Sequence, residues 1–232
     1  MNNKQNNLYL LAKGLGVSIL NIEDYHNKDS ELICKCSFGH EIEHPVEYLL
    51  KTNFECLKCE SIFHANIQDT TPYFLSLDAA SYTTGMSIFN RQGQLLGHKA
   101  LNVDKRKDFF DRLYEIKQEI IRIIEKNDIK CVILEDIQYQ SNPALFKKLA
   151  MLQGIIRYTV VIELQLDLIT AMADEWRSYN HIYGIKRNEQ KRAAINRAKT
   201  IFQEEIGEDE SESIFLGLYG IYKYKTISKE EE

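Results

Sequence analysis

The feature that most constrains the fold is a short, nearly all-apolar run at residues 129–135, Ile-Lys-Cys-Val-Ile-Leu-Glu. A run of this length and composition is typical of a β-strand that is buried on both of its faces. Apolar residues recur at helical spacing just before it, at positions 109, 113, 116, 120, 123 and 124, which predicts an amphipathic helix. Together the two patterns predict a layered α/β fold.

Further runs complete the predicted sheet. Residues 73–78, 84–90 and 94–103 are expected to form a meander, with Asn-Arg-Gln-Gly at 90–93 as the turn between its second and third strands. A helix is predicted to run from Pro143 to about residue 163, followed by a strand at 166–171 and two more helices. This order predicts a sheet with an antiparallel half and a parallel half. Gly85 and Gly154 are expected to permit close backbone packing.

Acidic residues stand at the ends of these runs. Asp78 closes the first strand, Glu135 closes the buried strand, and Asp209 and Glu212 open an apolar helix. Two-metal sites use such rigidly placed carboxylates to hold Mg²⁺ ions about 3.5–4 Å apart. Any one acidic residue after a buried strand could equally begin an ordinary loop. The ordered set of three segments favours a site for metal-dependent phosphodiester chemistry.

The composition is that of a globular protein with a core, since 44% of the 232 residues are hydrophobic and 27% are charged. The length favours one sizeable domain with a small appended module. No apolar run approaches the roughly 18–20 residues that span a bilayer. The start, Met-Asn-Asn-Lys-Gln-Asn-Asn, lacks the apolar core of a signal peptide. We expect an intracellular protein without a membrane segment.

The distribution of charge is more informative than its sum. The net charge is −5, yet residues 186–199 hold six basic side chains against one acid, Glu189, whereas residues 204–212 are strongly acidic. A basic stripe beside a carboxylate cluster suits an enzyme that grips phosphates and holds metal ions. A solvated helix face is the alternative explanation of the same charges.

Four of the five cysteines lie within residues 34–59. Three thiolates and one imidazole make a tetrahedral set for structural Zn²⁺, and the spacing selects Cys36, His40, Cys56 and Cys59. Disulfides are not expected in a reducing compartment. We predict that Cys34 faces away in a strand and that His44 ends a hairpin, although either could replace His40.

This segment resembles the small treble-clef zinc ribbons found beside phage and mobile-element nucleases, in which a C-x-x-G-H knuckle precedes a C-x-x-C knuckle. The knuckles here are Cys-Ser-Phe-Gly-His at 36–40 and Cys-Leu-Lys-Cys at 56–59, and the resemblance covers residues 6–61. It implies a zinc-binding module at residues 1–65. The metal would fold a segment that has too little apolar material to fold unaided.

The rest of the chain resembles the RuvC family of Holliday-junction resolvases, in its phage-type branch. The motifs that carry the resemblance are Leu-Ser-Leu-Asp-Ala-Ala-Ser-Tyr-Thr-Thr-Gly at 75–85, Leu-Glu-Asp-Ile-Gln-Tyr-Gln at 134–140, Phe-Lys-Lys-Leu-Ala-Met-Leu-Gln-Gly at 146–154 and Asp-Glu-Ser-Glu-Ser-Ile at 209–214. The matched region spans residues 71–222, about two thirds of the chain. The resemblance implies a ribonuclease H-like domain at 71–225, with a mixed five-stranded sheet flanked by helices, and then an acidic tail at 226–232.

The resemblance also implies site residues. The family's first aspartate falls on Asp78, its glutamate on Glu135, and its two carboxy-terminal acids on Asp209 and Glu212. A spacing of three residues puts the last two on one face at the start of a helix, near its positive dipole end. Glu212 departs from the family, where aspartate is usual, and Glu208 or Glu210 could contribute instead. Two Mg²⁺ ions per active site are implied, for which Mn²⁺ is expected to substitute.

Other residues are expected to contact DNA. Gln138 and Tyr139 lie where related enzymes probe the unpaired bases of a junction. Tyr139 could stack on a base, or it could be a buried tyrosine with a bonded hydroxyl. The phosphate-gripping segment before the last helix is matched by Trp176, Arg177, Lys186, Arg187 and Lys191. Lys191 is expected near the scissile phosphate, where it would support developing charge.

These residues and the resemblance predict a Mg²⁺-dependent endonuclease that cleaves branched DNA by hydrolysis, as a Holliday-junction resolvase does. Two cuts on a two-fold symmetric four-way junction need two active sites, which implies a homodimer. The helix at 143–163 could supply the interface through Phe146, Leu149, Met151 and Ile155. Two alternatives stay open: a junction-binding protein that has lost cleavage, for which Glu212 is the reason, and a broader nuclease for flaps, forks or RNA-containing hybrids.

Overall fold

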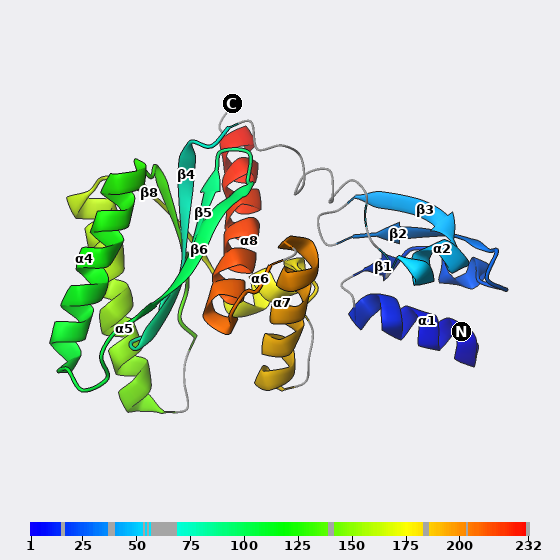
Figure 1. The fold of residues 1–232 in the computed structure, drawn as a ribbon, viewed down its shortest axis with the longest axis horizontal. Coiled ribbons are helices and arrows are strands. Elements are labelled where there is room, and N and C mark those ends of the chain that lie inside the picture. The colour runs from blue at the N-terminus through cyan, green and yellow to red at the C-terminus, as the bar shows by residue number, and fades with distance from the viewer. Residues whose placement is uncertain are drawn as a thin grey trace. The chain divides into compact units, whose positions relative to one another are not determined.

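Figure 1 presents a computed structural model of the chain, which describes residues 1–14, 17–36, 40–52, 54, 56, 69–138, 142–182, 186–202 and 204–230. Two compact units can be distinguished. The first unit comprises Met1–Asn66 and Arg177–Glu204, and the second comprises Ile67–Trp176 and Glu205–Glu232. In the described part of the chain, no helix has both the length and the apolar character that crossing a membrane requires.

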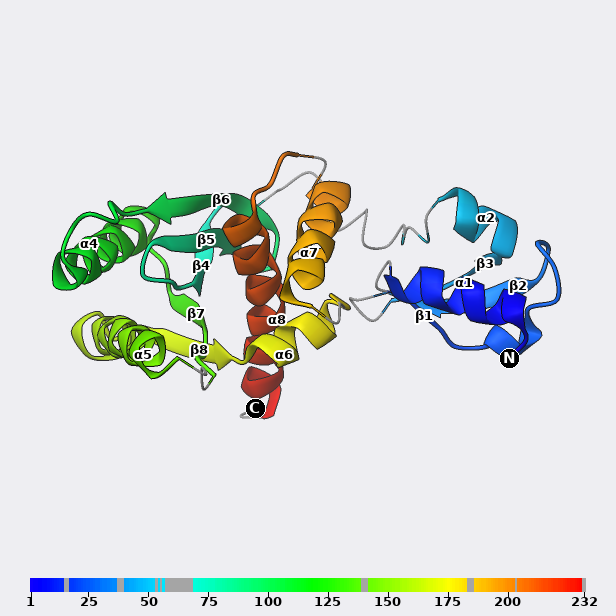
Figure 2. The same ribbon diagram turned by 90° about the horizontal axis from the view of Figure 1, so that it is seen from below.

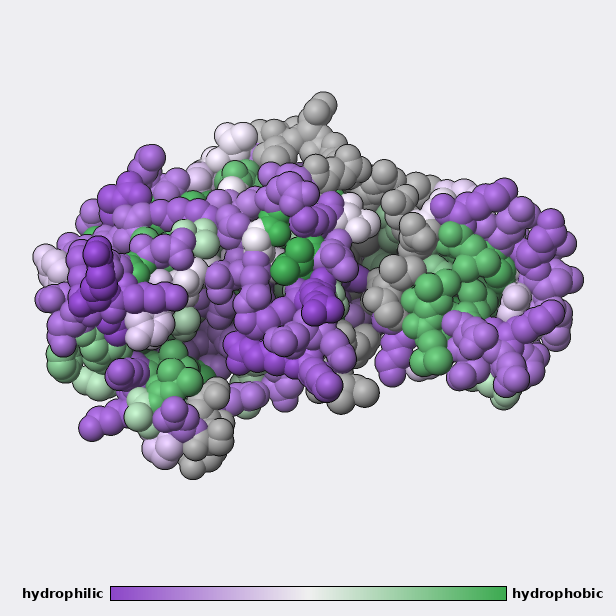
Figure 3. Space-filling view, turned by 60° about the horizontal axis from the view of Figure 1, so that its bottom comes forward, coloured by the Kyte–Doolittle hydropathy of each residue, from purple (hydrophilic) through white to green (hydrophobic). Residues whose placement is uncertain are grey.

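The first unit contains an antiparallel sheet of three strands in the order β1-β2-β3. Its elements at the amino-terminal end are α1 (Asn3–Gly14), β1 (Ser18–Ile19), η1 (Ile22–Asp24), β2 (Glu31–Lys35), β3 (Glu41–Pro45) and α2 (Val46–Lys51). Leu32 and Cys34 alternate with exposed residues along β2, and both belong to a small core that also includes Leu49. Leu10 and Leu11 are exposed instead, and Figure 3 shows a hydrophobic area on the surface of this segment.

Helix α7 (Arg187–Phe202) also belongs to the first unit. Its start is capped by Glu189, whose carboxylate accepts a 3.2 Å hydrogen bond from the backbone N–H of Lys186. Ala194 and Ala198 are its buried residues. The residues of the predicted basic stripe therefore all lie on α7 or directly before it: Lys186, Arg187, Lys191, Arg192, Arg197 and Lys199.

The second unit is built on a mixed sheet of five strands in the order β6-β5-β4-β7-β8. The strands are β4 (Pro72–Asp78), β5 (Thr83–Asn90), β6 (Leu95–Asn102), β7 (Cys131–Glu135) and β8 (Asp167–Ala171). Strands β4, β5 and β6 pair antiparallel, whereas β7 pairs parallel with both β4 and β8. The predicted antiparallel and parallel halves, and the mixed five-stranded sheet, are confirmed.

Helices cover both faces of this sheet. Helices α4 (Phe109–Asn127) and α5 (Pro143–Tyr158) lie on one face, and α8 (Glu208–Glu230) lies on the other (Figures 1 and 2). Side-chain caps mark the starts of α4 and α5. Asp108 accepts a hydrogen bond from the backbone N–H of Phe110, and Asn142 accepts from the backbone N–H groups of Ala144 and Leu145. These caps define where the two helices begin.

Three details differ from the sequence prediction. The helix predicted to run to residue 163 ends as α5 at Tyr158 and continues as a single π-helical turn, η2 (Thr159–Glu163). A short helix, α6 (Ala173–Tyr179), follows β8, so three helices are found there and not two; seven residues are too few to show a clear apolar period. Helix α8 continues to Glu230, because no glycine or proline interrupts it after Gly220.

Strands β4 and β5 carry large side chains on the face toward α4 and α5, and a small side chain at one position each on the face toward α8. Leu75 and Leu77 of β4 belong to the core against α4 and α5. The intervening Ser76 lies under α8, since a Cβ placed on Gly217 would come within 3.0 Å of it. Strand β5 repeats the pattern, with Met86 in the core and Ser87 bonded to Ser213 of α8 at 2.6 Å. The small side chains let α8 lie close to the sheet.

Candidate functional site

Asp78 and Glu135 end two neighbouring strands. Strands β4 and β7 are parallel, and their register pairs Leu77 with Leu134. The next residue along each strand is the acidic one, so Asp78 and Glu135 stand side by side at the same edge of the sheet. The sequence placed each of them at a strand end, and the register makes them neighbours.

Both carboxylates belong to the face of the sheet that α8 covers. Side chains alternate between the two faces of a strand, so Asp78 shares a face with Ser76, and Glu135 shares a face with Ile133. Ser76 lies next to Gly217 of α8, and Ile133 lies next to Gly220, since a Cβ on Gly220 would meet Ile133 at 2.3 Å. The opposite face of β4 and β7 is filled by the apolar core.

The first turn of α8 reaches the same edge. Gly85 is paired with Asp78 across β4 and β5, and a Cβ on Gly85 would lie only 1.9 Å from the backbone oxygen of Asp209. No side chain larger than hydrogen fits at this contact, as expected for Gly85 from the sequence. For Gly154 the same expectation is wrong, because within the described part of the chain no atom outside its own stretch of α5 lies within 4 Å of a Cβ placed there. The close contact at Gly85 brings Asp209 to the end of the strand that carries Asp78.

Glu212 and Glu210 have different surroundings on α8. Glu212 is buried, at 4% exposure, and stands three residues after Asp209. Glu210 shares a 2.9 Å hydrogen bond with Nδ1 of His98 on β6, and its second carboxylate oxygen accepts from the backbone N–H of Gly207 at 2.9 Å. Both oxygens of Glu210 are engaged, one by His98 on β6 and one by the backbone just before α8, which favours Glu212 as the fourth carboxylate.

Glu135 is held by contacts that the sequence did not reveal. Gln153 of α5, itself buried, donates a side-chain hydrogen bond to the backbone oxygen of Glu135. The indole Nε1–H of Trp176 donates to Oε2 of Glu135 at 2.7 Å. Trp176 belongs to the segment that resembles a phosphate-gripping one, and its own side chain is completely buried. The neighbouring Asp136 points elsewhere and pairs with Arg157 at 2.9 Å.

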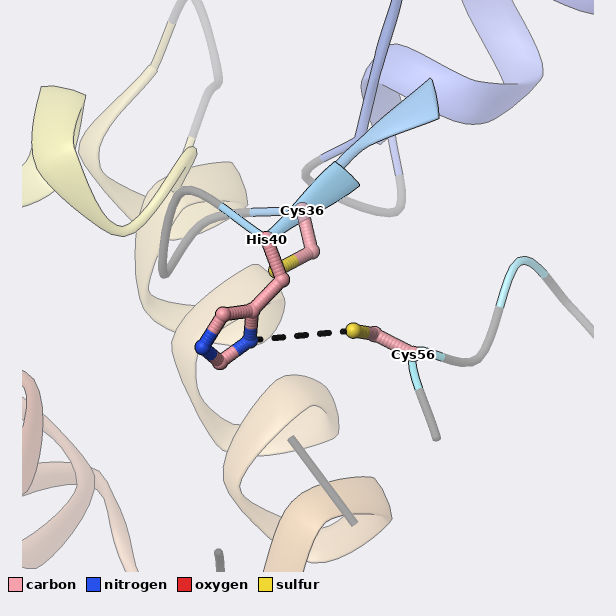
Figure 4. Close-up of side chains that lie close together, drawn as sticks. All are labelled: Cys36, His40 and Cys56. Carbon is pink, nitrogen blue, oxygen red and sulfur yellow. Dashed lines mark hydrogen bonds between the residues drawn. The ribbon is translucent and has the colours of Figure 1, made fainter. Parts of the chain in front are cut away.

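A separate cluster in the first unit combines sulfur and nitrogen ligands. Figure 4 shows the side chains of Cys36, His40 and Cys56 turned toward one another, with Sγ of Cys56 3.8 Å from Nδ1 of His40. The potential ligand atoms of these three residues all lie within 4.8 Å of one another. The knuckle between Cys36 and His40 is closed by a 3.0 Å hydrogen bond from the backbone N–H of Cys36 to the backbone oxygen of His40. Cys59, the predicted fourth ligand, lies outside the described residues.

The two alternative zinc ligands have other positions. Cys34 lies in β2 with its side chain fully buried, and burial raises the pKa of its thiol to about 11. His44 lies in β3, where its ring stacks on Tyr48 at 4.4 Å. His40 therefore completes the three-residue cluster.

Comparison with known proteins gives a clear result for structure only. No protein-family model matches the sequence, and no curated protein matches it significantly. A solved structure of Thermus thermophilus RuvC aligns with a TM-score of 0.53 at 10% identity, covering 66% of this chain and 96% of RuvC. A structure of T. thermophilus RuvC in complex with Holliday junction substrate gives 0.52 at 10% identity, covering 66% and 94%. The chain shares the fold of RuvC. The predicted ribonuclease H-like fold class is confirmed by this match.

The donor atoms in the two places suit different metals. The RuvC-like domain offers carboxylate oxygens, the hard ligands that Mg²⁺ and Mn²⁺ prefer. The cluster of Cys36, His40 and Cys56 offers the softer sulfur and nitrogen set that Zn²⁺ prefers. Among the described residues, only this second set brings three possible ligand atoms within 4.8 Å of one another.

The residues expected to contact DNA are distributed over both units. Gln138 follows β7 of the RuvC-like domain and donates a 3.3 Å hydrogen bond to Asp174, whereas Tyr139 lies outside the described residues. The basic residues Arg177, Lys186, Arg187 and Lys191 belong to the first unit. Their role in phosphate binding stays a prediction.

Proposed function

We propose that this protein is a Mg²⁺-dependent endonuclease that hydrolyses phosphodiesters of branched DNA, with the four-way Holliday junction as its substrate. The observation that carries the proposal is the placement of Asp78 and Glu135 at adjacent strand ends, at the edge that Asp209 of α8 approaches. The shared fold supports it, because one matched structure is RuvC in complex with a Holliday junction substrate.

In this proposal Asp78, Glu135, Asp209 and Glu212 hold two Mg²⁺ ions. Bound there, the ions would lower the pKa of a water that attacks the phosphorus and would stabilise the charge on the leaving oxygen. The buried strands and the close contact of α8 with Gly85 keep the carboxylates in place during the reaction. Lys191 is proposed to neutralise charge on the scissile phosphate.

The proposal is tested by separating binding from cleavage. Asp78→Asn and Glu135→Gln each remove a ligand charge and little packing, so we expect junction binding to be retained while cleavage falls more than about 100-fold, or roughly 2.7 kcal/mol. Asp136→Asn is the matched control, because Asp136 is the next residue but pairs with Arg157. A Glu135→Gln enzyme that cleaves at more than a hundredth of the wild-type rate would remove Glu135 from the ligand set.

Substrate choice needs its own comparison. Cleavage of a labelled four-way junction is expected to exceed that of a linear duplex, a flap, a fork and an RNA-containing hybrid of equal length. Equal rates on all branched substrates would favour the broader nuclease. Junction binding without cleavage in either Mg²⁺ or Mn²⁺ would favour the second candidate, a binding protein, for which the glutamate at position 212 is the motivating feature.

We also propose that the protein is a homodimer that uses α5. Of the residues predicted for this interface, Met151 is exposed while Phe146, Leu149 and Ile155 are partly buried. Tyr158, about two helical turns beyond Met151, is 57% exposed. We expect Met151→Glu combined with Tyr158→Lys to yield a monomer by analytical ultracentrifugation, with the melting temperature little changed. A wild-type monomer at micromolar concentration would contradict the dimer.

A structural Zn²⁺ in the first unit is the remaining proposal. Its ligands would be Cys36, His40, Cys56 and Cys59, which fill all four tetrahedral positions with protein atoms and leave none for a substrate. Support comes from the convergence of the three described ligands and from the small core of this segment, to which Cys36 and Cys56 themselves belong.

A further inference from the structure

Trp176 is the single tryptophan of the chain, and it lies in the short helix α6 directly after β8. Its side chain is completely buried, and its indole N–H donates the 2.7 Å hydrogen bond to Oε2 of Glu135. An indole nitrogen can only donate, and donation to a carboxylate is a charge-assisted bond. The bond therefore favours one orientation of the Glu135 carboxylate.

Glu135 needs such an external constraint. The last torsion of a glutamate side chain is broad, so packing of the methylene groups does not set the plane of the carboxylate. The backbone around Glu135 is already anchored. The side chain of Gln153 donates to the carbonyl oxygen of Glu135, and the backbone N–H of Asp136 donates to the backbone oxygen of Ala171 at 2.8 Å. The hydrogen bond from Trp176 acts on a further degree of freedom, the plane of the Glu135 carboxylate.

We propose that Trp176 is a positioning residue for Glu135, which fixes the plane of the Glu135 carboxylate and so the direction in which that carboxylate can coordinate a metal. This inference rests on the proposed function, because it takes Glu135 to be a Mg²⁺ ligand. Trp176 itself touches neither substrate nor metal. Hydrogen-bonding partners of metal ligands typically change metal affinity or activity about 10–100-fold when they are mutated.

The single tryptophan makes a spectroscopic test possible on the full-length protein. A ¹⁵N-labelled sample has one indole N–H resonance, and we expect it to shift during a Mg²⁺ titration with the midpoint that calorimetry gives for Mg²⁺ binding. The shift is expected to disappear in Glu135→Gln. A resonance that stays in place while calorimetry records Mg²⁺ binding would overturn the role of Trp176. If calorimetry records no Mg²⁺ binding, the proposed function fails, and this inference with it.

A substitution tests the same inference by activity. Trp176→Phe keeps a buried aromatic ring but removes the N–H donor, so we expect the Mg²⁺ concentration for half-maximal cleavage to rise about tenfold, with junction affinity unchanged. Phe74→Leu is the matched control, because Phe74 is also completely buried but lies toward the opposite end of β4 from Asp78. Equal Mg²⁺ shifts in both variants would mean that Trp176 acts only through packing.

Discussion

At the residue scale, two acids within one turn of α8, Glu210 and Glu212, have different surroundings. Glu210 is bonded to His98 and to the backbone of Gly207, whereas Glu212 is buried on the same helix. Burying a carboxylate is costly unless a partner or a cation compensates its charge. In the proposed function, a bound Mg²⁺ would contribute to this compensation.

The two glutamates give a sharp comparison. We expect Glu212→Gln to reduce cleavage more than about 100-fold, in line with the loss of a ligand charge, and Glu212→Asp to be tolerated. Glu210→Gln should leave cleavage in limiting Mg²⁺ nearly unchanged, because its carboxylate is bonded on the β6 side. Rates are measured on a labelled junction across a Mg²⁺ titration. If Glu212→Gln cleaves at the wild-type rate while Glu210→Gln shows a severe loss, then Glu210, and not Glu212, is the metal ligand.

At the element scale, the close contact of α8 with the sheet places Asp209. Small residues on both surfaces make the contact possible: Gly85, Ser87 and Ser76 on the strands, and Ser213, Gly217 and Gly220 on the helix. At its other end α8 is held by Lys223, which donates to the backbone oxygen of Thr170 at 2.9 Å. The helix is therefore fixed along its length, and its first turn cannot move without breaking these contacts.

Gly85→Ala tests this placement. The added Cβ would lie 1.9 Å from a backbone oxygen, so the start of α8 must move, and we expect a loss of about 1–3 kcal/mol in the free energy of unfolding together with reduced cleavage. Gly97→Ala in β6 is the control, because no atom of the described residues lies within 4 Å of its Cβ, and alanine there is expected to add about 0.4–1 kcal/mol to stability. Urea unfolding measures both. Equal stability of the two variants would contradict the close contact.

At the scale of the whole molecule, the two sites belong to different units. The carboxylates lie in the second unit, which has the larger core, and the cysteine cluster lies in the first, whose core at the amino-terminal end is small. Metal binding and folding are coupled when a small core cannot hold a segment together by itself. The two proposed metals therefore have separable roles, one in stability and one in chemistry.

Zinc removal is expected to act on the first unit. We expect one Zn²⁺ per chain by elemental analysis, retained in Cys131→Ser and lost in Cys56→Ser or Cys59→Ser. Loss of the metal should abolish hydrogen-exchange protection in β2 and β3 while β4 and β7 keep theirs, because Zn²⁺ bridges residues around a small core. Absence of zinc from protein purified without a chelator would disprove the site.

The sequence by itself determined the order of the strands and long helices from residue 71 onward, the position of Asp78 and Glu135 at strand ends, and the knuckle that joins Cys36 to His40. These features are local, since they depend on the period of apolar residues and on short spacings. The predicted helix boundaries were less accurate, as at η2 and α6, where local propensity is weak and packing decides.

Only the tertiary structure decided which of the acids meet and what holds them. The register of β4 against β7 made Asp78 and Glu135 neighbours, and the contact at Gly85 brought Asp209 beside them. The hydrogen bonds between Glu210 and His98 and between Glu135 and Trp176 join residues far apart in the sequence. No local pattern encodes such pairs, because each depends on how two distant elements pack against the same face of a sheet.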